Sequence, residues 1–308
     1  MFVSRGFRRL AVEGRRRGAV LSLAVLAAAL AVLAGPPAQA GEGASRIVSI
    51  GGSITEIVFA LGAQDRLVAV DTTSRYPQAA GDLPDVGYMR ALSAEGVLSR
   101  APDLVIAIEG AGPPQVIDVL REASVPFVEI PEGYDGPGLR AKILAVGDAL
   151  GAEAAAAELA ERVARDLDAA RAEAQAAARE SGGAPSVAFL MSMAGGRPMA
   201  AGAGTSADAM IALAGGTNVF SGFSGFKPVT REALIAADPA AIVTMRRHGS
   251  EPSEAVRRMP GVALTRAGQH DRIIAMDGLY LLGFGPRTAE AVRDLAARLR
   301  GGEDARDD

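Results

Sequence analysis

Residues 152–180 are rich in Ala, Glu and Arg and contain neither glycine nor proline. Leu159, Val163 and Leu167 recur at every fourth position, which is the spacing of one face of an α-helix. At 1.5 Å per residue, an uninterrupted helix of this kind would be about 40 Å long. A pair of glycines follows and marks its end. A rigid rod in the middle of the chain predicts two lobes connected by one helix.

Short apolar runs alternate with helical stretches on both sides of this predicted helix. Such runs, separated by helices, are typical of buried strands in a parallel sheet. They lie at residues 46–50, 67–70, 104–108 and 127–130 before the helix, and at 186–190, 241–245 and 272–276 after it. The sequence therefore predicts an α/β fold with two Rossmann-like lobes, each built on a parallel sheet, and a ligand cleft between them.

The two halves repeat each other's pattern. Residues 53–56 and 205–208 both have the spacing of a capping box, a hydroxyl followed three residues later by an acid. In each half a Leu stands eight residues after the hydroxyl. Glu95 and Glu232 each lie seven residues before a proline and two residues after a Ser or Thr. Two matches in the same order indicate an internal duplication.

Residues 1–40 have the pattern of an export signal. An arginine-rich start precedes an apolar run at 19–34, and Ala38-Gln39-Ala40 is a small-x-small cleavage site. We expect cleavage after Ala40 and a soluble protein in the periplasm. A retained N-terminal anchor is the alternative, and the arginine pairs leave the export route, Sec or Tat, open. No Cys follows the apolar run, which excludes a lipoprotein anchor.

The composition excludes several classes of partner and site. Removing the six Arg and one Glu of residues 1–40 from the 32 basic and 36 acidic side chains leaves 26 and 35, a net charge of −9. An acidic surface of this kind argues against nucleic acid as a partner. The chain has no Cys, and its two histidines are His248 and His270. Thiolate metal sites are therefore excluded, and a multi-histidine zinc site is not expected.

Tyr88 and Arg90 stand two residues apart, directly before a predicted helix start. Gly87 opens the loop, Ser93 has the position of a helix cap, and Glu95 lies in the first helical turn, where the dipole favours a carboxylate. A nearby guanidinium lowers the cost of forming a phenolate, and a phenolate is a suitable ligand for ferric iron. The pattern indicates an iron ligand at Tyr88, with a half-buried packing role as the alternative.

Four segments, at residues 47–56, 87–96, 198–202 and 229–232, resemble the helical-backbone class of periplasmic substrate-binding proteins, which carry cobalamin, siderophores or haem. The stretch Gly-Tyr-x-Arg-Ala-Leu-Ser-Ala-Glu-Gly at 87–96 resembles in particular the haem-binding proteins of ABC haem importers. The resemblance covers essentially the whole mature chain. It implies a protein that is not an enzyme and that captures ferric haem b and delivers it to a permease dimer with its ATPase subunits.

The resemblance also implies roles for individual residues. The family's matching tyrosine is an axial ligand of the haem iron, which points to Tyr88. Arg90 would support the phenolate or pair with a haem propionate. Arg246 and Arg247 directly follow the strand at 241–245. One of them resembles the family's arginine that hydrogen-bonds the phenolate, and which one is left open.

The sequence differs from part of the family where a distal iron ligand would be expected. Some relatives carry a His in the loop after the first strand of the second lobe, where this chain has residues 191–196, including Met193. Met193 and His248 are the candidate distal ligands, although five-coordinate iron with one haem is the simpler expectation. His270 is expected to be exposed. Tyr76, Tyr134 and Tyr280 are expected to be packing residues.

Glu95 and Glu232 have a second possible role besides interacting with the helix dipole, namely docking on a partner protein. In the resembled class, one acid per lobe docks against arginines of the two permease subunits, and these residues match those positions. A monomeric state and an outer-membrane haem receptor acting upstream are further expectations. The expected division is a signal peptide (1–40), an N-terminal lobe (45–150), a linking helix (151–182), a C-terminal lobe (183–300) and a flexible tail (301–308).

Two alternative functions remain open at this point. The same fold binds a ferric siderophore or a corrinoid in other branches of the class, and neither ligand needs an axial Tyr beside an Arg. An exported α/β enzyme could instead use the turn at Gly51 and Gly52 to hold a phosphorylated substrate. That signal is weak, because no further glycine pattern and no Lys-Ser or Lys-Thr pair follows it.

Overall fold

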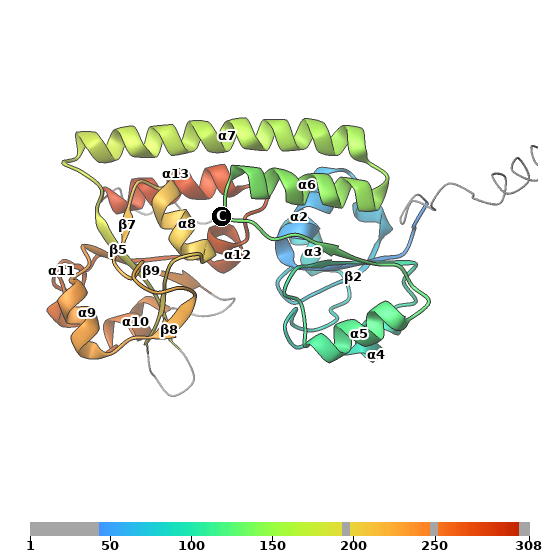
Figure 1. The fold of residues 1–308 in the computed structure, drawn as a ribbon, viewed down its shortest axis with the longest axis horizontal. Helices are drawn as coiled ribbons and strands as arrows, with labels where there is room; N and C mark the ends of the chain where they lie inside the picture. The colour runs from blue at the N-terminus through green and yellow to red at the C-terminus, as the bar shows by residue number, and fades with distance from the viewer. Residues whose placement is uncertain (1–42, 193–197, 247–251, 302–308) are drawn as a thin grey trace, which may run out of the picture. The chain divides into compact units, whose positions relative to one another are not determined.

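The computed structural model describes residues 43–192, 198–246 and 252–301. Met193, Arg247, His248 and the predicted signal peptide lie outside the described residues. Among the residues that are described, no helix is long and apolar enough to cross a membrane. Figure 1 shows two lobes, each built around a sheet, with one long helix running along both of them.

The first lobe contains a four-stranded parallel sheet in the order β2-β1-β3-β4. Its strands are β1 (Ile47–Ile50), β2 (Leu67–Val70), β3 (Leu104–Ile108) and β4 (Phe127–Ile130). All four were expected from their apolar runs, and this prediction is confirmed. The inner strands β1 and β3 are buried along their whole length. Strands covered by helices on both faces are apolar throughout, which is why they are visible in the sequence.

Helices cover both faces of this sheet. They are α2 (Gly52–Ala60), α3 (Gln78–Gly81), α4 (Ala94–Leu98), α5 (Pro114–Glu122) and α6 (Gly136–Leu150), with a 3₁₀ turn η1 (Gln64–Arg66). Side chains of α2 and α6 share one buried cluster with Ile47, Leu104 and Ile106. Those of α4 and α5 share another with the alternate residues Val48 and Val105. The alternation follows from the two-residue repeat of a strand.

The second lobe has a mixed sheet in the order β10-β9-β5-β6-β8, with β7 paired to β5. Its strands are β5 (Ser186–Ser192), β6 (Pro198–Ala201), β7 (Thr217–Asn218), β8 (Phe226–Pro228), β9 (Ala241–Arg246) and β10 (Ile273–Asp277). The predicted strands β5, β9 and β10 are parallel as expected, whereas β6 pairs antiparallel with β5 and β8 pairs antiparallel with β6. The sequence does not reveal β8 because it is a short, exposed edge strand.

Seven helical segments accompany this sheet in the described part of the lobe. They are α8 (Ser206–Leu213), α9 (Arg231–Ala237), α10 (Pro252–Arg257), η2 (Val262–Leu264), α11 (Arg266–Gln269), α12 (Gly278–Leu282) and α13 (Thr288–Leu299).

The linking helix α7 (Glu153–Glu180) has 28 residues, and its existence as one continuous helix is confirmed. It packs along α6 of the first lobe and α13 of the second (Figure 1). Its buried stripe includes the predicted Leu159, Val163 and Leu167 together with several alanines. Small residues allow the close approach of α6: a Cβ placed on Gly147 would lie 2.1 Å from the Cβ of Ala156. A substitution at Gly147 would therefore push the two helices apart.

One predicted capping box is wrong and the other is confirmed in part. Thr205 caps α8 by accepting a hydrogen bond from the N–H of Asp208 (3.1 Å). In the first lobe, helix α2 begins at Gly52, Gly51 is its N-cap, and Ser53 lies inside the first turn without capping it. Gly51 has φ +113°, a conformation that favours glycine, and this turn sets the helix start in place of a hydroxyl cap. Glu56 is consequently free to bind elsewhere.

A buried lysine connects the first lobe to the second. Lys142 on α6 has no exposed side-chain surface, and its Nζ lies 2.5 Å from the carboxylate of Glu132. The same ammonium donates to the carbonyls of Gly283 (3.2 Å) and Phe284 (3.0 Å), between α12 and α13. Burial lowers the pKa of Lys142, and the charge of Glu132 opposes that shift. The carboxylate and the two carbonyls therefore offset the cost of burying the charge.

We expect Lys142→Ala to lower the free energy of unfolding by about 3 kcal/mol, because the largely buried Glu132 would lose its cationic partner. The double variant Lys142→Met with Glu132→Gln removes both charges and should recover much of that loss. Urea unfolding followed by circular dichroism measures both. A single variant as stable as wild type would show that the ion pair contributes nothing to folding.

Candidate functional site

The loop that carries Tyr88 is fixed to the end of strand β2. The N–H of Val86 donates to the carbonyl of Val70, the last residue of the strand (2.9 Å). The N–H of Thr72 donates to the carbonyl of Gly87 (3.0 Å). Tyr88 is therefore anchored to the carboxyl end of this strand by the residue directly before it.

The other end of the loop is fixed to the turn after β3. The N–H of Leu92 donates to the carbonyl of Gly112 (2.9 Å), and the N–H of Gly112 donates to the carbonyl of Met89 (2.8 Å). Strands β2 and β3 both run parallel to β1, so their carboxyl ends lie at the same edge of the sheet. Ligands of open α/β sheets bind at this edge. The fold thus brings Tyr88 to the position where a binding site is expected.

Tyr88 combines an accessible side chain with a fixed backbone. The residue is 46% exposed, while its carbonyl accepts a hydrogen bond from the N–H of Ala91 (2.7 Å). Ser93 caps helix α4 through the N–H of Gly96 (3.3 Å), as the sequence predicts. A phenol held in this way is open to a ligand without a rearrangement of the loop.

Arg90 is exposed, and its charge acts on Tyr134. Burial and the carboxylate of Glu132 raise the pKa of Tyr134, while Arg90 acts in the opposite direction. Tyr134 is half-buried in the loop after β4 and packs edge-on against Phe284 of the second lobe, with 5.3 Å between ring centroids. The sequence analysis expected Tyr134 to be a packing residue, which its contact with Phe284 confirms, but did not predict its place near the charge of Arg90. Its place after a strand end was the signal that could have linked it to the Arg90 loop.

The turn at Gly51 and Gly52 does not form an open phosphate cradle. The N–H of Gly51 donates to the carboxylate of Asp71 (2.9 Å), and the N–H of Gly52 donates to the hydroxyl of Thr73 (3.0 Å). Both donors are thus used inside the protein. The alternative of an enzyme that binds a phosphorylated substrate at this turn has no support from the geometry.

Arg246 is the last residue of β9, at the carboxyl edge of the second sheet. It is partly buried, and its Nη2 donates to the carbonyl of Ala275 on β10 (3.1 Å). Because Arg247, His248 and Met193 lie outside the described residues, the choice between Arg246 and Arg247 and the two candidate distal ligands stay predictions. His270 is exposed at the end of α11, as expected.

The two acids of the repeated pattern lie at equivalent places in the two lobes. Glu95 is in the first turn of α4, which Ser93 caps, and Glu232 is in the first turn of α9, which Thr230 caps (3.1 Å to the N–H of Ala233). Both carboxylates are exposed. The structure therefore leaves both acids accessible to a partner protein.

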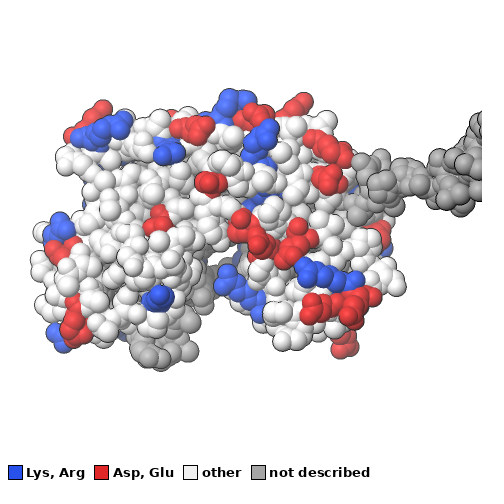
Figure 2. Space-filling model, in the orientation of Figure 1, with Lys and Arg blue, Asp and Glu red and all other residues white. Residues whose placement is uncertain are grey.

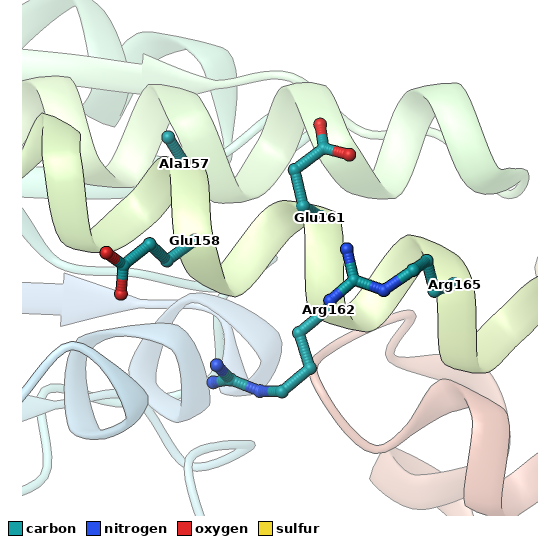
Figure 3. Close-up of a pocket in the computed structure, with 5 residues that line it drawn as sticks. All are labelled: Ala157, Glu158, Glu161, Arg162 and Arg165. Atoms are coloured by element: carbon teal, nitrogen blue, oxygen red, sulfur yellow. The ribbon is translucent and has the colours of Figure 1, made fainter.

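Two depressions of the surface lie outside the Tyr88 loop. A shallow depression on α7 is lined by Ala157, Glu158, Glu161, Arg162 and Arg165. Figure 3 shows that their charged ends point in different directions, so they form no common binding point. Figure 2 shows the surface hollowed between the lobes on the side away from α7, and the described part of this face carries mixed charges without a continuous basic patch.

Comparisons with known proteins agree on one family. The periplasmic binding protein family matches residues 47–279. Among solved structures, the chain is 42% identical to the periplasmic haem-binding protein BhuT in complex with two haems, with a TM-score of 0.77 over 83% of this chain and 97% of that one. It is 40% identical to the periplasmic haem-binding protein RhuT from Roseiflexus sp. RS-1, with a TM-score of 0.76 over 84% and 98% of the two chains.

Two curated relatives bear on the kind of system. An uncharacterised ABC transporter substrate-binding lipoprotein of Bacillus subtilis, YvrC, is 28% identical over 253 residues, which are 82% of this chain and 78% of that one. A vitamin B12-binding protein of Yersinia pestis is 37% identical over 91 residues, 30% of this chain and 31% of that one. The chain therefore belongs to the periplasmic binding protein family, and within it the chain is similar over most of its length to periplasmic haem-binding proteins.

Proposed function

We propose that this protein captures haem in the periplasm and delivers it to the permease of an ABC importer. The observation that carries the proposal is Tyr88, an accessible phenol fixed at the carboxyl edge of the first sheet and followed by Arg90. The similarity to haem-binding proteins over nearly their whole length supports the same ligand. A phenolate favours ferric iron, the form of haem expected outside the reducing cytoplasm.

Residues of both lobes would bind the haem. Tyr88 supplies the axial oxygen to the iron of haem b. Arg90 supports the phenolate or pairs with a propionate, and either Arg246 or Arg247 hydrogen-bonds the phenolate from the other lobe. We propose five-coordinate iron and one haem, with His248 and Met193 as the residues that would ligate if a sixth position is filled.

The ligand is tested by titrating the mature protein with hemin and following the Soret band and the resonance Raman spectrum. We expect saturation at one hemin per protein and a phenolate-to-iron charge-transfer band. Cyanocobalamin and a ferric siderophore are titrated in parallel, because one relative is a vitamin B12-binding protein. Tight binding of either in place of hemin would overturn the proposal.

Export and division of the chain follow from the same proposal. Residues 1–40 would be removed, leaving a first lobe (45–150), a linking helix (151–182), a second lobe (183–300) and a tail (301–308). The mature protein would act as a monomer that receives haem from an outer-membrane receptor system and docks on the permease dimer and its ATPase subunits through Glu95 and Glu232.

We expect the periplasmic protein to begin at Gly41, because Ala38-Gln39-Ala40 is the cleavage site that follows the apolar run. Intact-mass spectrometry of the protein from an osmotic-shock fraction gives its first residue. Recovery of the full 308 residues in the membrane fraction would mean a retained anchor.

A further inference from the structure

Arg287 connects the second lobe to the first through a nearly buried carboxylate. It lies directly before α13, and its guanidinium donates to both oxygens of Glu56 on α2, at 2.6 Å and 3.2 Å. Glu56 is 5% exposed. Burial raises the pKa of Glu56, against the hydrogen bonds and charge of Arg287. A two-point ion pair of this kind fixes both the position and the plane of the guanidinium.

The fixed guanidinium covers one face of Tyr76. The central carbon of the Arg287 guanidinium lies 3.5 Å from the centre of the Tyr76 ring, which is a close cation–π stack. Tyr76 is nevertheless 46% exposed, and Tyr280 lies on the same guanidinium at 5.0 Å. Tyr76 is therefore attached to the second lobe although it belongs to the loop after β2 in the first.

The loop with Tyr76 is the one that anchors the Tyr88 segment. Thr72, four residues before Tyr76, donates the hydrogen bond to the carbonyl of Gly87. Asp71 fixes the start of this loop, because its carboxylate accepts from the hydroxyls of Thr73 (2.7 Å) and Ser74 (2.8 Å). At the far end of the loop, the side chain of Tyr76 stacks on Arg287.

We propose that Arg287 is a positioning residue of the binding site, which, held by Glu56, stacks on Tyr76 and so fixes from the second lobe the loop that anchors Tyr88. This inference rests on the proposed function, since the position of Tyr88 matters for binding only if its oxygen ligates haem iron. In this proposal Arg287 does not bind the haem directly. Its effect passes through Tyr76 and the backbone to the axial oxygen.

The test uses Tyr76→Ala, Tyr76→Phe and Arg287→Lys in the full mature chain, with hemin release to apomyoglobin as the main measurement. Tyr76→Ala and Arg287→Lys should each speed hemin release about tenfold, which is the effect expected from losing a cation–π contact that is only partly shielded from water. Arg287→Lys keeps the charge but loses the planar stack and the two-point pairing. Tyr76→Phe keeps the ring and should release hemin at the wild-type rate.

Iron-free protoporphyrin IX separates positioning of the ligand from direct contact with the porphyrin. A residue that acts through the Tyr88 oxygen should leave the affinity for protoporphyrin IX unchanged, because no iron–oxygen bond forms. Wild-type hemin release in Tyr76→Ala would overturn the inference, and so would an equal loss of affinity for hemin and protoporphyrin IX. If Arg287→Lys fails to fold, Tyr76→Ala decides alone, because it leaves the Glu56–Arg287 pair in place.

Failure of the proposed function looks different. In that case the wild-type protein shows no charge-transfer band with hemin, whatever residue stands at position 76. A wild-type band that is lost in Tyr88→Phe, together with unchanged release in Tyr76→Ala, would remove the role of Arg287 alone.

Discussion

Tyr88→Phe is expected to abolish the phenolate-to-iron charge-transfer band and to speed haem release at least about 100-fold, since an axial ligand contributes more than the outer contacts of a metal site. The change removes the oxygen and keeps the ring. Because Tyr88 is 46% exposed, stability should stay within about 0.5 kcal/mol of wild type. Absorption and resonance Raman spectra of the hemin complex give the ligation, and transfer to apomyoglobin gives the release rate.

Tyr134→Phe is the matched control, because it also removes a phenol oxygen, and Tyr134 lies within the electrostatic reach of Arg90. Its hemin complex should keep the charge-transfer band. Arg90→Ala should have a smaller effect than Tyr88→Phe, because it removes electrostatic support and leaves the ligand. An unchanged spectrum in Tyr88→Phe would assign the iron to another residue, with His248 the first to be tested.

Glu95→Ala combined with Glu232→Ala is expected to stop haem uptake while leaving hemin binding and folding intact. Both acids are exposed in the first turns of capped helices, so their removal costs the fold little. Each is proposed to meet an arginine of a permease subunit, and losing one charged partner should weaken docking by about tenfold or more. Uptake and stimulated ATPase activity in proteoliposomes measure the effect.

Glu153→Ala is the control for this experiment. Glu153 is likewise an exposed acid in the first turn of a helix, α7, but it has no counterpart in the repeated pattern. It should leave uptake unchanged. A double variant at Glu95 and Glu232 that drives uptake at the wild-type rate would refute docking, and one that no longer binds hemin would place the acids at the ligand.

Local signals made much of the fold predictable. The strands of the first sheet could be recognised because strands buried on both faces are continuous apolar runs. The linking helix α7 could be recognised because its one buried stripe repeats apolar residues at the helical period. The caps Ser93, Thr205 and Thr230 were predictable because a cap and its partner lie within three residues. Strand β8 was not, since an exposed edge strand leaves no apolar pattern.

The candidate site likewise has features that the sequence reveals and features that only the structure reveals. The two-residue spacing of Tyr88 and Arg90 is a property of the chain, so this motif and the family resemblance could be recognised without coordinates. The link between Arg90 and Tyr134 could not, because more than forty residues of strand, turn and helix separate them. Parallel strand ends bring these loops to one edge only when the sheet has formed.

Glu56 shows most clearly where sequence reasoning stops. The residue types at 53–56 satisfy the local rule for a capping box, yet Gly51 caps the helix and Glu56 binds Arg287, 231 positions away. By itself the sequence determined the α/β class, the two-lobe repeat and the linking helix, and it revealed the Tyr88-x-Arg90 motif, because all of these depend on short-range periodicity and spacing. Only the tertiary structure decided which charges meet across the lobes. A buried carboxylate needs a cationic partner to offset the loss of its hydration. Which cation lies close enough depends on the fold, and the spacing of neighbouring residues does not reveal it.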